Sequence, residues 1–282
     1  MINFNTRSNG VKLQSKSQPQ SHLQLMMRPK KSLGQHFLTD ENIIDKIAES
    51  VDIPFNSRLI EIGPGTGALT KALIGISDDL HAFEIDQRAV EVLQNKFPAV
   101  AIHHQDILQI DWNEWSIGKP NTFVVGNLPY NITSPILFSL LNARHLLSGA
   151  ILMMQKEVAE RITANIRTKA YGILSVQTQL MSSPEILFPV SRNCFAPKPK
   201  VESAVIKLIF DKDLLKCSDA HLKTIVRTAF NQRRKKLSNA LKPIINKEDL
   251  PANFDFDKRA EAWIPPKYEK LSALLEETGI LA

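Results

Sequence analysis

A glycine-rich turn, Glu61-Ile62-Gly63-Pro64-Gly65-Thr66-Gly67, follows a short apolar stretch and precedes a helical pattern. Glycines at such a junction let the backbone turn tightly and approach a bound ligand closely. The spacing is G-x-G-x-G, whereas dinucleotide-binding proteins carry G-x-G-x-x-G, and no Lys-Ser/Thr follows as in a phosphate-binding loop. Gly63 and Gly65 therefore indicate a small-molecule site, with a purely structural turn as the alternative.

Two acidic residues, Glu84 and Asp106, stand at the ends of the next two predicted strands. A carboxylate offers only hydrogen-bond acceptors, so Glu84 could accept both hydroxyl groups of a ribose. Asp106 could accept from an adenine amino group in the same way. Either carboxylate alone would more often be a helix cap or a surface charge. Together with the glycine-rich turn they predict an adenosine-containing cofactor, and S-adenosylmethionine fits better than NAD.

The turn Asn127-Leu128-Pro129-Tyr130 follows a fourth predicted strand, at the edge of the sheet where such proteins bind ligands. The Asn127 side-chain oxygen and the Leu128 carbonyl are suitable acceptors for an amino group. Pro129 restricts Leu128 to an extended conformation and so fixes where that carbonyl points. Tyr130 offers a face on which a base can stack, worth about 1–3 kcal/mol, and which favours a developing positive charge. A plain turn before a helix is the alternative.

Three further motifs stand in order around this turn: 33–38 (LGQHFL), 194–205 (CFAPKPKVESAV) and 229–237 (AFNQRRKKL). The turn itself resembles the N-P-P-Y-type motif of methyltransferases that modify exocyclic amino groups. Taken together, the four motifs resemble the ribosomal RNA adenine dimethyltransferase family, in particular its bacterial small-subunit branch. The resemblance runs from about Pro29 to near the C-terminus.

This resemblance implies a Rossmann-like class I methyltransferase that uses S-adenosylmethionine and releases S-adenosylhomocysteine. The implied reaction is N6,N6-dimethylation of two adjacent adenosines in the 3′-terminal hairpin loop of 16S ribosomal RNA, within the maturing small ribosomal subunit. The adenine N6 lone pair is delocalised into the ring, so the amine is a poor nucleophile. Asn127 and Leu128 would hold its N–H groups so that the nitrogen pyramidalises, and positioning should supply most of the rate. The base must be unpaired or flipped out to enter the pocket.

The resemblance assigns three more site residues. It places Phe195 on the other side of the adenine, although a core phenylalanine is the alternative. It also implies that His36 and Leu38 touch the cofactor. Many relatives carry Asn where this chain has His36, so a satisfied structural histidine is equally reasonable, and its main chain could be what matters. The remaining histidines show no ligand spacing, and we predict no metal.

These site residues need a sheet whose strands end at a common edge. The apolar stretches predict seven strands, at 58–62, 80–85, 100–103, 122–126, 150–154, 185–188 and 203–210. Helical patterns lie between them, at 68–74, 87–97, 135–142, 157–164 and 171–181. This alternation predicts an α/β fold with a mainly parallel seven-stranded sheet and helices on both faces. The last two strands look antiparallel and would close one edge.

After Asp211 only helices are predicted, at 219–231, 235–241 and 266–277. We therefore expect a methyltransferase domain at 28–211 and a small all-α RNA-binding domain at 212–282. Residues 1–27 contain no acidic residue and no apolar periodicity, and we expect a disordered extension there. An organellar transit peptide or a misassigned start are the alternatives for this leader.

Positive charge is concentrated at 212–247, which carries a net +8 while the whole chain carries +6. A local excess of this size predicts a polyanion partner, most simply nucleic acid, with a solvated helical face as the alternative. The candidate RNA-binding residues are Arg227, Arg233, Arg234, Lys235 and Lys236, extended around the pocket mouth by Lys198 and Lys200. Contacts of this kind position an RNA without reading its sequence.

Composition excludes several other classes of protein. Two cysteines, Cys194 and Cys217, are too few for a disulfide scaffold or a cysteine-based zinc module and suit a reducing compartment. No apolar run approaches the ~18 residues of a membrane span, so we expect no membrane contact. We also expect a cytoplasmic protein and a monomer, and no sequence feature decides the oligomeric state. The alternatives to the main prediction are a non-catalytic ribosome-assembly factor, an organellar relative and a large-subunit dimethyltransferase.

Overall fold

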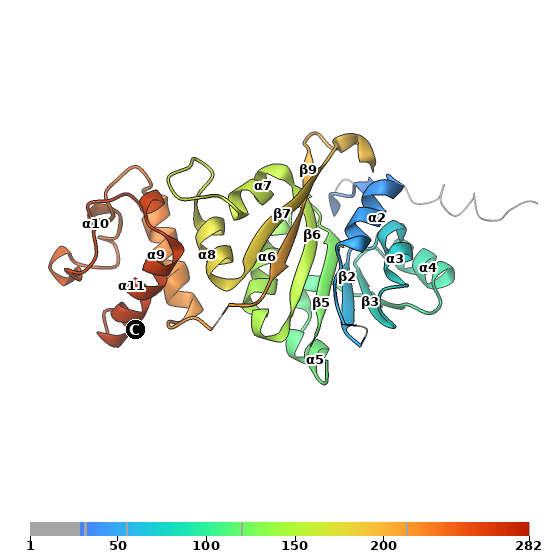
Figure 1. Ribbon diagram of the computed structural model, residues 1–282, viewed down its shortest axis with the longest axis horizontal. Coiled ribbons are helices and arrows are strands. Elements are labelled where there is room, and N and C mark those ends of the chain that lie inside the picture. Colours follow the sequence, from blue (N-terminus) through green and yellow to red (C-terminus); the bar gives the residue numbers. More distant parts are fainter. Residues whose placement is uncertain (1–28, 31–32, 55, 120, 213, 282) are drawn as a thin grey trace, which may run out of the picture.

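The computed structural model describes residues 29–30, 33–54, 56–119, 121–212 and 214–281. The predicted extension at 1–27 lies outside these residues. The fold is built on one seven-stranded sheet with the strand order β4-β3-β2-β5-β6-β9-β7 (Figure 1). Its strands are β2 Arg58–Ile62, β3 Asp79–Glu84, β4 Ala101–His104, β5 Phe123–Asn127, β6 Gly149–Gln155, β7 Ser183–Val190 and β9 Ser203–Ile209.

Strands β2 to β6 pair in parallel, whereas β9 runs antiparallel between β6 and β7. The predicted mainly parallel sheet with an antiparallel edge is therefore confirmed. The central strands read as continuous apolar runs because both of their faces are covered. Gly126 in β5 shows how tightly they pack, since a Cβ there would lie 2.8 Å from the carbonyl oxygen of Ile62.

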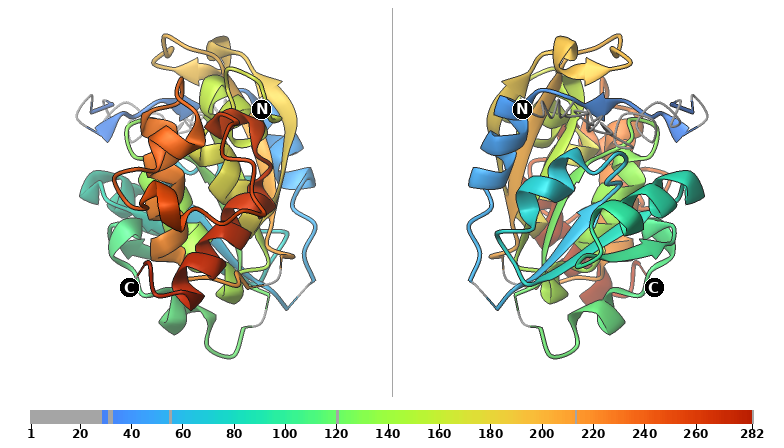
Figure 2. Two further views of the ribbon diagram at one scale, coloured as in Figure 1. Left: turned by 90° about the vertical axis from the view of Figure 1, so that its left-hand side faces the viewer. Right: turned by 90° about the vertical axis from the view of Figure 1, so that its right-hand side faces the viewer.

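Helices cover both faces of the sheet, as predicted (Figure 2). Helices α2 Glu41–Glu49, α3 Ala68–Leu73 and α4 Gln87–Lys96 lie on one face, over Leu59 and Val125. Helices α5 Trp112–Ser116, α6 Thr133–Asn142, α7 Lys156–Ile162 and α8 Ile173–Met181 belong to the other face, over Ile60 and Val124. Neighbouring residues of one strand thus point into two different cores, as the period of two requires.

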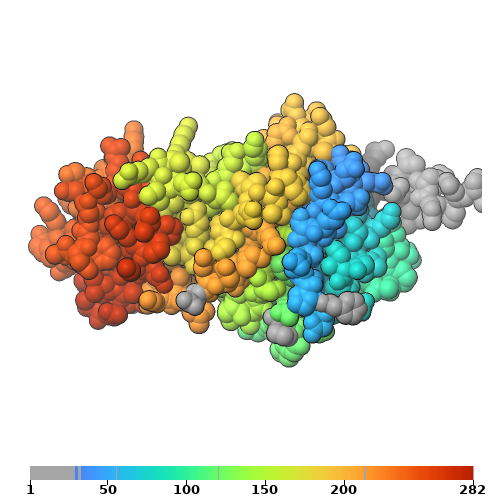
Figure 3. Space-filling model, in the orientation of Figure 1, coloured from blue at the N-terminus to red at the C-terminus, as the bar shows by residue number. Residues whose placement is uncertain are grey.

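The chain after Lys212 forms the helices α9 Asp219–Asn231, α10 Leu237–Ala240 and α11 Pro265–Glu277. These helices pack onto the core that lies under α6 to α8. Leu222 and Tyr268 belong to the same buried cluster as Ile60. Helix α10 is shorter than predicted because Lys236 is extended and forms a bridge with Arg259. Figure 3 shows this helical segment, in orange and red, at one end of an elongated molecule.

Polar contacts also fix the helical segment to the sheet half of the molecule. The Arg144 guanidinium donates to both carboxylate oxygens of Asp219, at 3.0 and 3.2 Å. The buried Tyr171 hydroxyl donates to the Trp263 carbonyl at 2.8 Å. In the part of the chain that the structure describes, no helix is long and apolar enough to cross a membrane.

Two histidines on neighbouring strands form a pair that their sequence spacing did not reveal. His81 Nδ1 lies 3.0 Å from His103 Nε2, while His81 Nε2 lies 2.7 Å from Asp79 Oδ1. Lys119 also pairs with Asp79, and the His103 ring packs edge-on against Trp115. A hydrogen bond between two ring nitrogens requires one of them to be unprotonated. Burial, with the nearby charges of His81 and an arginine, lowers the pKa of His103.

Acidification is therefore expected to destabilise the protein through His103. Because its folded-state pKa is lowered, the unfolded chain takes up this proton first as the pH falls. The contribution to stability is complete above about pH 6.5 and is lost below that value, toward the folded-state pKa. The melting temperature of His103→Phe should fall less than that of the wild type between about pH 8 and 5.5. His104→Phe, at the exposed neighbouring position, should show the same pH dependence of the melting temperature as the wild type. If His103→Phe shows that same dependence too, His103 does not cause the loss of stability in acid.

Candidate active site

A cavity of about 230 Å³ opens at the carboxyl ends of the parallel strands. This is the edge at which open α/β sheets bind their ligands. Ten of the eleven residues predicted for cofactor binding and catalysis line it: His36, Leu38, Gly63, Gly65, Glu84, Asp106, Asn127, Leu128, Pro129 and Tyr130. The structure therefore brings together residues that are spread over 95 positions of the sequence, while the roles of the individual side chains remain predictions.

The turn after β2 needs glycine at two positions for different reasons. Gly65 has φ +57°, and a Cβ there would lie 2.9 Å from the Phe37 ring, so the backbone can stay close to the cavity only without a side chain. Gly67 has φ +78°, and its Cβ would meet the Phe97 ring at 2.4 Å. The turn is thus specified by its packing as well as by the space it leaves for a ligand.

Glu84 ends β3 with its carboxylate buried and oriented by backbone donors. Its Oε2 accepts from the Gly65 N–H at 3.0 Å, and its Oε1 accepts from the N–H groups of Ile85 and Asp86, both at 2.9 Å. Burial raises the pKa of Glu84, although these three donors counteract that effect. A carboxylate has about four acceptor positions, so about one remains for a ligand rather than the two that we expected for a ribose.

Asp106 follows β4 and begins a short 3-10 helix, Ile107–Gln109. Its Oδ1 caps this helix by accepting from the Leu108 N–H at 2.9 Å. Its Oδ2 has no hydrogen bond to any described residue, so the residue can act as a cap and still offer an acceptor to the cavity.

Asn127 ends β5 with its amide held in one orientation. Its Nδ2 donates to the His36 carbonyl at 3.0 Å, which leaves Oδ1 free as an acceptor. The Leu128 N–H is used by the Met153 carbonyl at 2.9 Å, whereas the Leu128 carbonyl accepts no hydrogen bond from the described residues. Two neighbouring acceptors are thus available at the cavity wall.

Tyr130 forms the wall beside these acceptors. Its hydroxyl lies 2.8 Å from Ser203 Oγ, and its ring stacks against His36 with 5.5 Å between centroids. The ring of His36 is itself anchored, because its Nδ1 lies 2.7 Å from the Pro197 carbonyl oxygen. His36 is therefore a hydrogen-bonded wall residue whose main-chain carbonyl orients Asn127.

Phe195 is the one predicted site residue that the structure does not place in the cavity wall. It is 4% exposed and belongs to the core under α2, α3 and α4. It lies in β8 Phe195–Ala196, which pairs antiparallel with β1 Phe37–Leu38. Stacking of Phe195 on an adenine stays a prediction, and the structure gives the residue a place in the core.

Several cavity residues were not predicted from the sequence. Glu61 is 1% exposed, and its Oε2 has no hydrogen-bond partner among the described residues. Burial, together with the nearby Glu84 carboxylate, raises the pKa of Glu61 to about 8. Ile85 and Leu108 also line the cavity, and their exposed fractions of 51% and 37% are high for apolar side chains. The available signal was their position, since Ile85 directly follows Glu84 and Leu108 lies two residues after Asp106.

Most of the predicted RNA-binding cations are exposed. Arg227, Arg234, Lys235, Lys198 and Lys200 have no carboxylate within 4.0 Å among the residues that the structure describes, whereas Lys236 pairs with Asp257 at 3.0 Å. Within the described ranges, no group of three or more His, Cys, Asp or Glu side chains is placed to hold a metal ion.

Arg233 differs from its neighbours because all three nitrogens of its guanidinium donate a hydrogen bond. It donates to Glu261 Oε2 at 2.6 Å and to the carbonyls of Thr168 and Lys169, both at 2.7 Å. These bonds fasten the connection between α7 and α8 to the C-terminal helical segment. The same connection carries Arg167 with φ +65°, an unusual conformation for a residue other than glycine. The geometry thus assigns Arg233 to holding this connection.

Two solved structures with high similarity share this architecture. A dimethyladenosine transferase from Plasmodium falciparum is 26% identical, has a TM-score of 0.74, and is matched over 86% of this chain and 98% of that chain. The 23S rRNA methyltransferase ErmE is also 26% identical, with a TM-score of 0.64 and coverage of 85% and 99%. The fold is therefore that of a class I RNA methyltransferase.

The chain belongs to the ribosomal RNA adenine dimethylase family, whose model matches residues 26–261. A ribosomal RNA small subunit methyltransferase A from Salinibacter ruber is 43% identical over 269 residues, covering 92% of this chain and 90% of the relative. The protein of the same description from Parabacteroides distasonis is 40% identical over 259 residues, with coverage of 89% and 96%. The predicted family and enzyme class are confirmed.

Proposed function

We propose that this protein uses S-adenosylmethionine to dimethylate N6 of two adjacent adenosines in the 3′-terminal hairpin loop of 16S ribosomal RNA. It would act on the maturing small subunit, as a cytoplasmic monomer. The observation that carries the proposal is the pair of free acceptors, Asn127 Oδ1 and the Leu128 carbonyl, beside the Tyr130 ring at the cavity. The names of the relatives from Salinibacter ruber and Parabacteroides distasonis support the small subunit as substrate.

The cavity residues fit S-adenosylmethionine. Glu84 has an acceptor position left for a ribose hydroxyl, and Asp106 Oδ2 is available for the adenine amino group. Ile85 and Leu108 offer apolar surface for the adenine ring. Glu61 Oε2 has no partner among the described residues and lines the cavity, where it could accept from the ammonium group of the methionine part. The positive charge of that group would favour the ionised form of the buried carboxyl group. When bound, this cofactor supplies a methyl group activated by its sulfonium.

The turn at 127–130 would prepare the acceptor nitrogen of the RNA. Asn127 Oδ1 and the Leu128 carbonyl accept from the two N–H groups of adenine N6, which lets the nitrogen pyramidalise and takes its lone pair out of conjugation with the ring. The Tyr130 face stacks on the base and favours the positive charge that develops on it. After the first transfer one N–H remains, so one acceptor is enough to hold the monomethylated base for the second.

Exposed cations would hold the RNA while the target base occupies the cavity. Arg227, Arg234, Lys235 and Lys236 lie at the C-terminal side, and Lys198 and Lys200 lie in the connection before β9. We add Arg167 and Lys169, which are exposed on the connection that Arg233 holds. The α7–α8 connection and the segment before β9 both project from the upper side of the molecule in Figure 1, the side where the parallel strands end.

Transfer of a labelled methyl group tests this proposal. Small subunits and large subunits that lack the modification are each incubated with the protein and labelled S-adenosylmethionine. Label in small-subunit RNA supports the proposal. Label only in large-subunit RNA assigns the protein to the large-subunit branch of the family, and tight small-subunit binding without transfer favours the assembly-factor alternative.

A further inference from the structure

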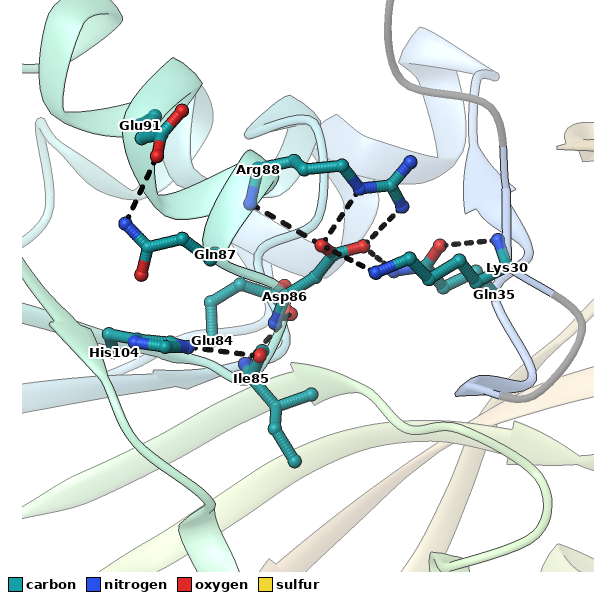
Figure 4. A network of polar contacts seen from close by, with 9 residues as sticks. All are labelled: Lys30, Gln35, Glu84, Ile85, Asp86, Gln87, Arg88, Glu91 and His104. Carbon is teal, nitrogen blue, oxygen red and sulfur yellow. Dashed lines mark hydrogen bonds and ion pairs between the residues drawn. The ribbon is translucent and has the colours of Figure 1, made fainter.

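The segment 33–38 lies across the cofactor cavity and is fastened at both ends. At the first end, Gln35 accepts from the Lys30 N–H at 2.8 Å and donates through Nε2 to Asp86 Oδ2 at 3.3 Å. Lys30 Nζ adds an ion pair to Asp86 Oδ1 at 3.4 Å. Figure 4 shows these groups converging on the Asp86 carboxylate from a segment more than fifty residues away in the sequence.

At the second end, the same segment holds the catalytic turn. The His36 carbonyl accepts from Asn127 Nδ2 at 3.0 Å, and Phe37–Leu38 pair with Phe195–Ala196 as a two-stranded sheet. Gln35, His36, Phe37 and Leu38 all contribute to the cavity wall. The segment therefore links the strand end that carries Glu84 to the strand end that carries Asn127.

The Asp86 carboxylate has more hydrogen-bond partners than a helix cap requires. It caps α4 by accepting from the Arg88 N–H at 3.3 Å, a task that one oxygen completes. Its side chain is 1% exposed, yet it also forms an ion pair with the Arg88 guanidinium, through Nε at 3.0 Å and through Nη2, and accepts from Gln35 and from Lys30. Its own N–H holds Glu84 Oε1 at 2.9 Å. Asp86 does not line the cavity, so it could act on a ligand only through Gln35 and Glu84.

We propose that Asp86 is a positioning residue for the cofactor: its side chain fastens the segment 33–38 at the cavity wall through Gln35, at the residue whose backbone N–H also holds the carboxylate of Glu84. This inference rests on the proposed use of S-adenosylmethionine. Losing the contact between Gln35 and Asp86 releases only the first end of the segment, because the second end stays held by Asn127 and by the pairing with Phe195–Ala196. The cofactor and the product should therefore both bind more weakly. The KM for the cofactor should rise, while kcat stays within about twofold of the wild type.

Asp86→Ser and Gln35→Ala test the inference. Serine caps a helix about as well as aspartate but is too short to reach Gln35 and Lys30. Calorimetric titration with S-adenosylhomocysteine should show about tenfold weaker binding for each variant, since hydrogen bonds to charged groups are the strong ones. The double variant should bind no more weakly than the weaker single variant, because both changes open the same contact. Gln35→Ala leaves the cap untouched and gives the answer if Asp86→Ser folds poorly.

Asp111→Ser is the matched control. Asp111 also caps a helix, by accepting from the Asn113 N–H at 2.9 Å, but it does not line the cavity. It should leave the affinity for S-adenosylhomocysteine unchanged. If the wild type binds this ligand and Asp86→Ser binds it equally well, Asp86 is a helix cap only and the inference is overturned. If the wild type does not bind it at all, the proposed cofactor is wrong, and the inference falls with it.

Discussion

Replacing Asn127 with alanine should lower kcat for methyl transfer by about 10²–10³-fold, the cost of removing one well-placed hydrogen-bond partner of a reacting group. The Asn127 side chain offers Oδ1 to the cavity because its Nδ2 is held by the His36 carbonyl. Alanine removes both interactions, so the adenine amino group loses an acceptor. Single-turnover transfer to small subunits measures the chemical step.

The same variant should bind S-adenosylhomocysteine almost as well as the wild type. The contacts that fit the cofactor lie mainly at Glu84, Asp106 and the glycine-rich turn, which the substitution does not touch. The segment 33–38 loses its contact with Asn127 but stays held at that end by the pairing of Phe37–Leu38 with Phe195–Ala196. Asn142→Ala, at the exposed end of α6, is the matched control and should keep full activity. Equal losses of cofactor affinity and of transfer in Asn127→Ala would rule out the role given to this residue.

Reversing two charges, with Arg234→Glu and Lys235→Glu together, should weaken binding to the small subunit by more than tenfold at low salt. Both side chains are exposed and have no carboxylate partner among the described residues, so their charge is available to phosphates. Each phosphate contact adds nearly one unit to the slope of log K against log salt. The slope should therefore become shallower by about two units in filter binding across a salt series.

Lys267→Glu with Lys270→Glu makes the same change of charge on the exposed face of α11 and serves as the control. Its salt slope should stay closer to that of the wild type. An unchanged slope in Arg234→Glu/Lys235→Glu would remove this surface from the interface. Arg233 is kept out of the experiment, because replacing it would break three hydrogen bonds to Glu261, Thr168 and Lys169 and could disturb the fold itself.

Several strands were predictable because they are short apolar runs with a glycine or charged residue at or directly after their end. The predicted range 58–62 matches β2, and 219–231 matches α9. Helix α2 was missed although its signals are present: Asp40 caps it, and Ile44, Ile47 and Ala48 form its buried side. The pair β1 and β8 has two residues in each strand, too few to show a period of two.

The cavity lining was largely predictable because parallel strands deliver their carboxyl ends to one edge. The contacts among those ends were not, since they depend on registers and rotamers that a sequence pattern does not contain. Asp86 meets Gln35 and Lys30, and His81 meets His103, only after strands and loops from distant positions have come together. For Phe195 the sequence suggested a contact that the structure does not show. Its motif predicted stacking on the target adenine, whereas the structure packs Phe195 in the core.

The charges in the sequence also predicted the RNA-binding residues only in part. The basic run 233–236 reads as one patch in the sequence, yet Arg233 is engaged by Glu261 and Lys236 by Asp257. The carboxylates that pair with Arg233 and Lys236 lie 28 and 21 residues further along the chain. The net charge of the basic run therefore does not show which of its cations are available to bind RNA.

The central claim is tested most directly by mass spectrometry of ribosomal RNA from small subunits that lacked the modification and were then incubated with the protein and S-adenosylmethionine. The account predicts N6,N6-dimethyladenosine at two adjacent positions of the 3′-terminal hairpin loop, with both adenosines converted at completion. Modification of another base, arrest at the monomethyl product, or an unmodified hairpin in the presence of bound protein would contradict it.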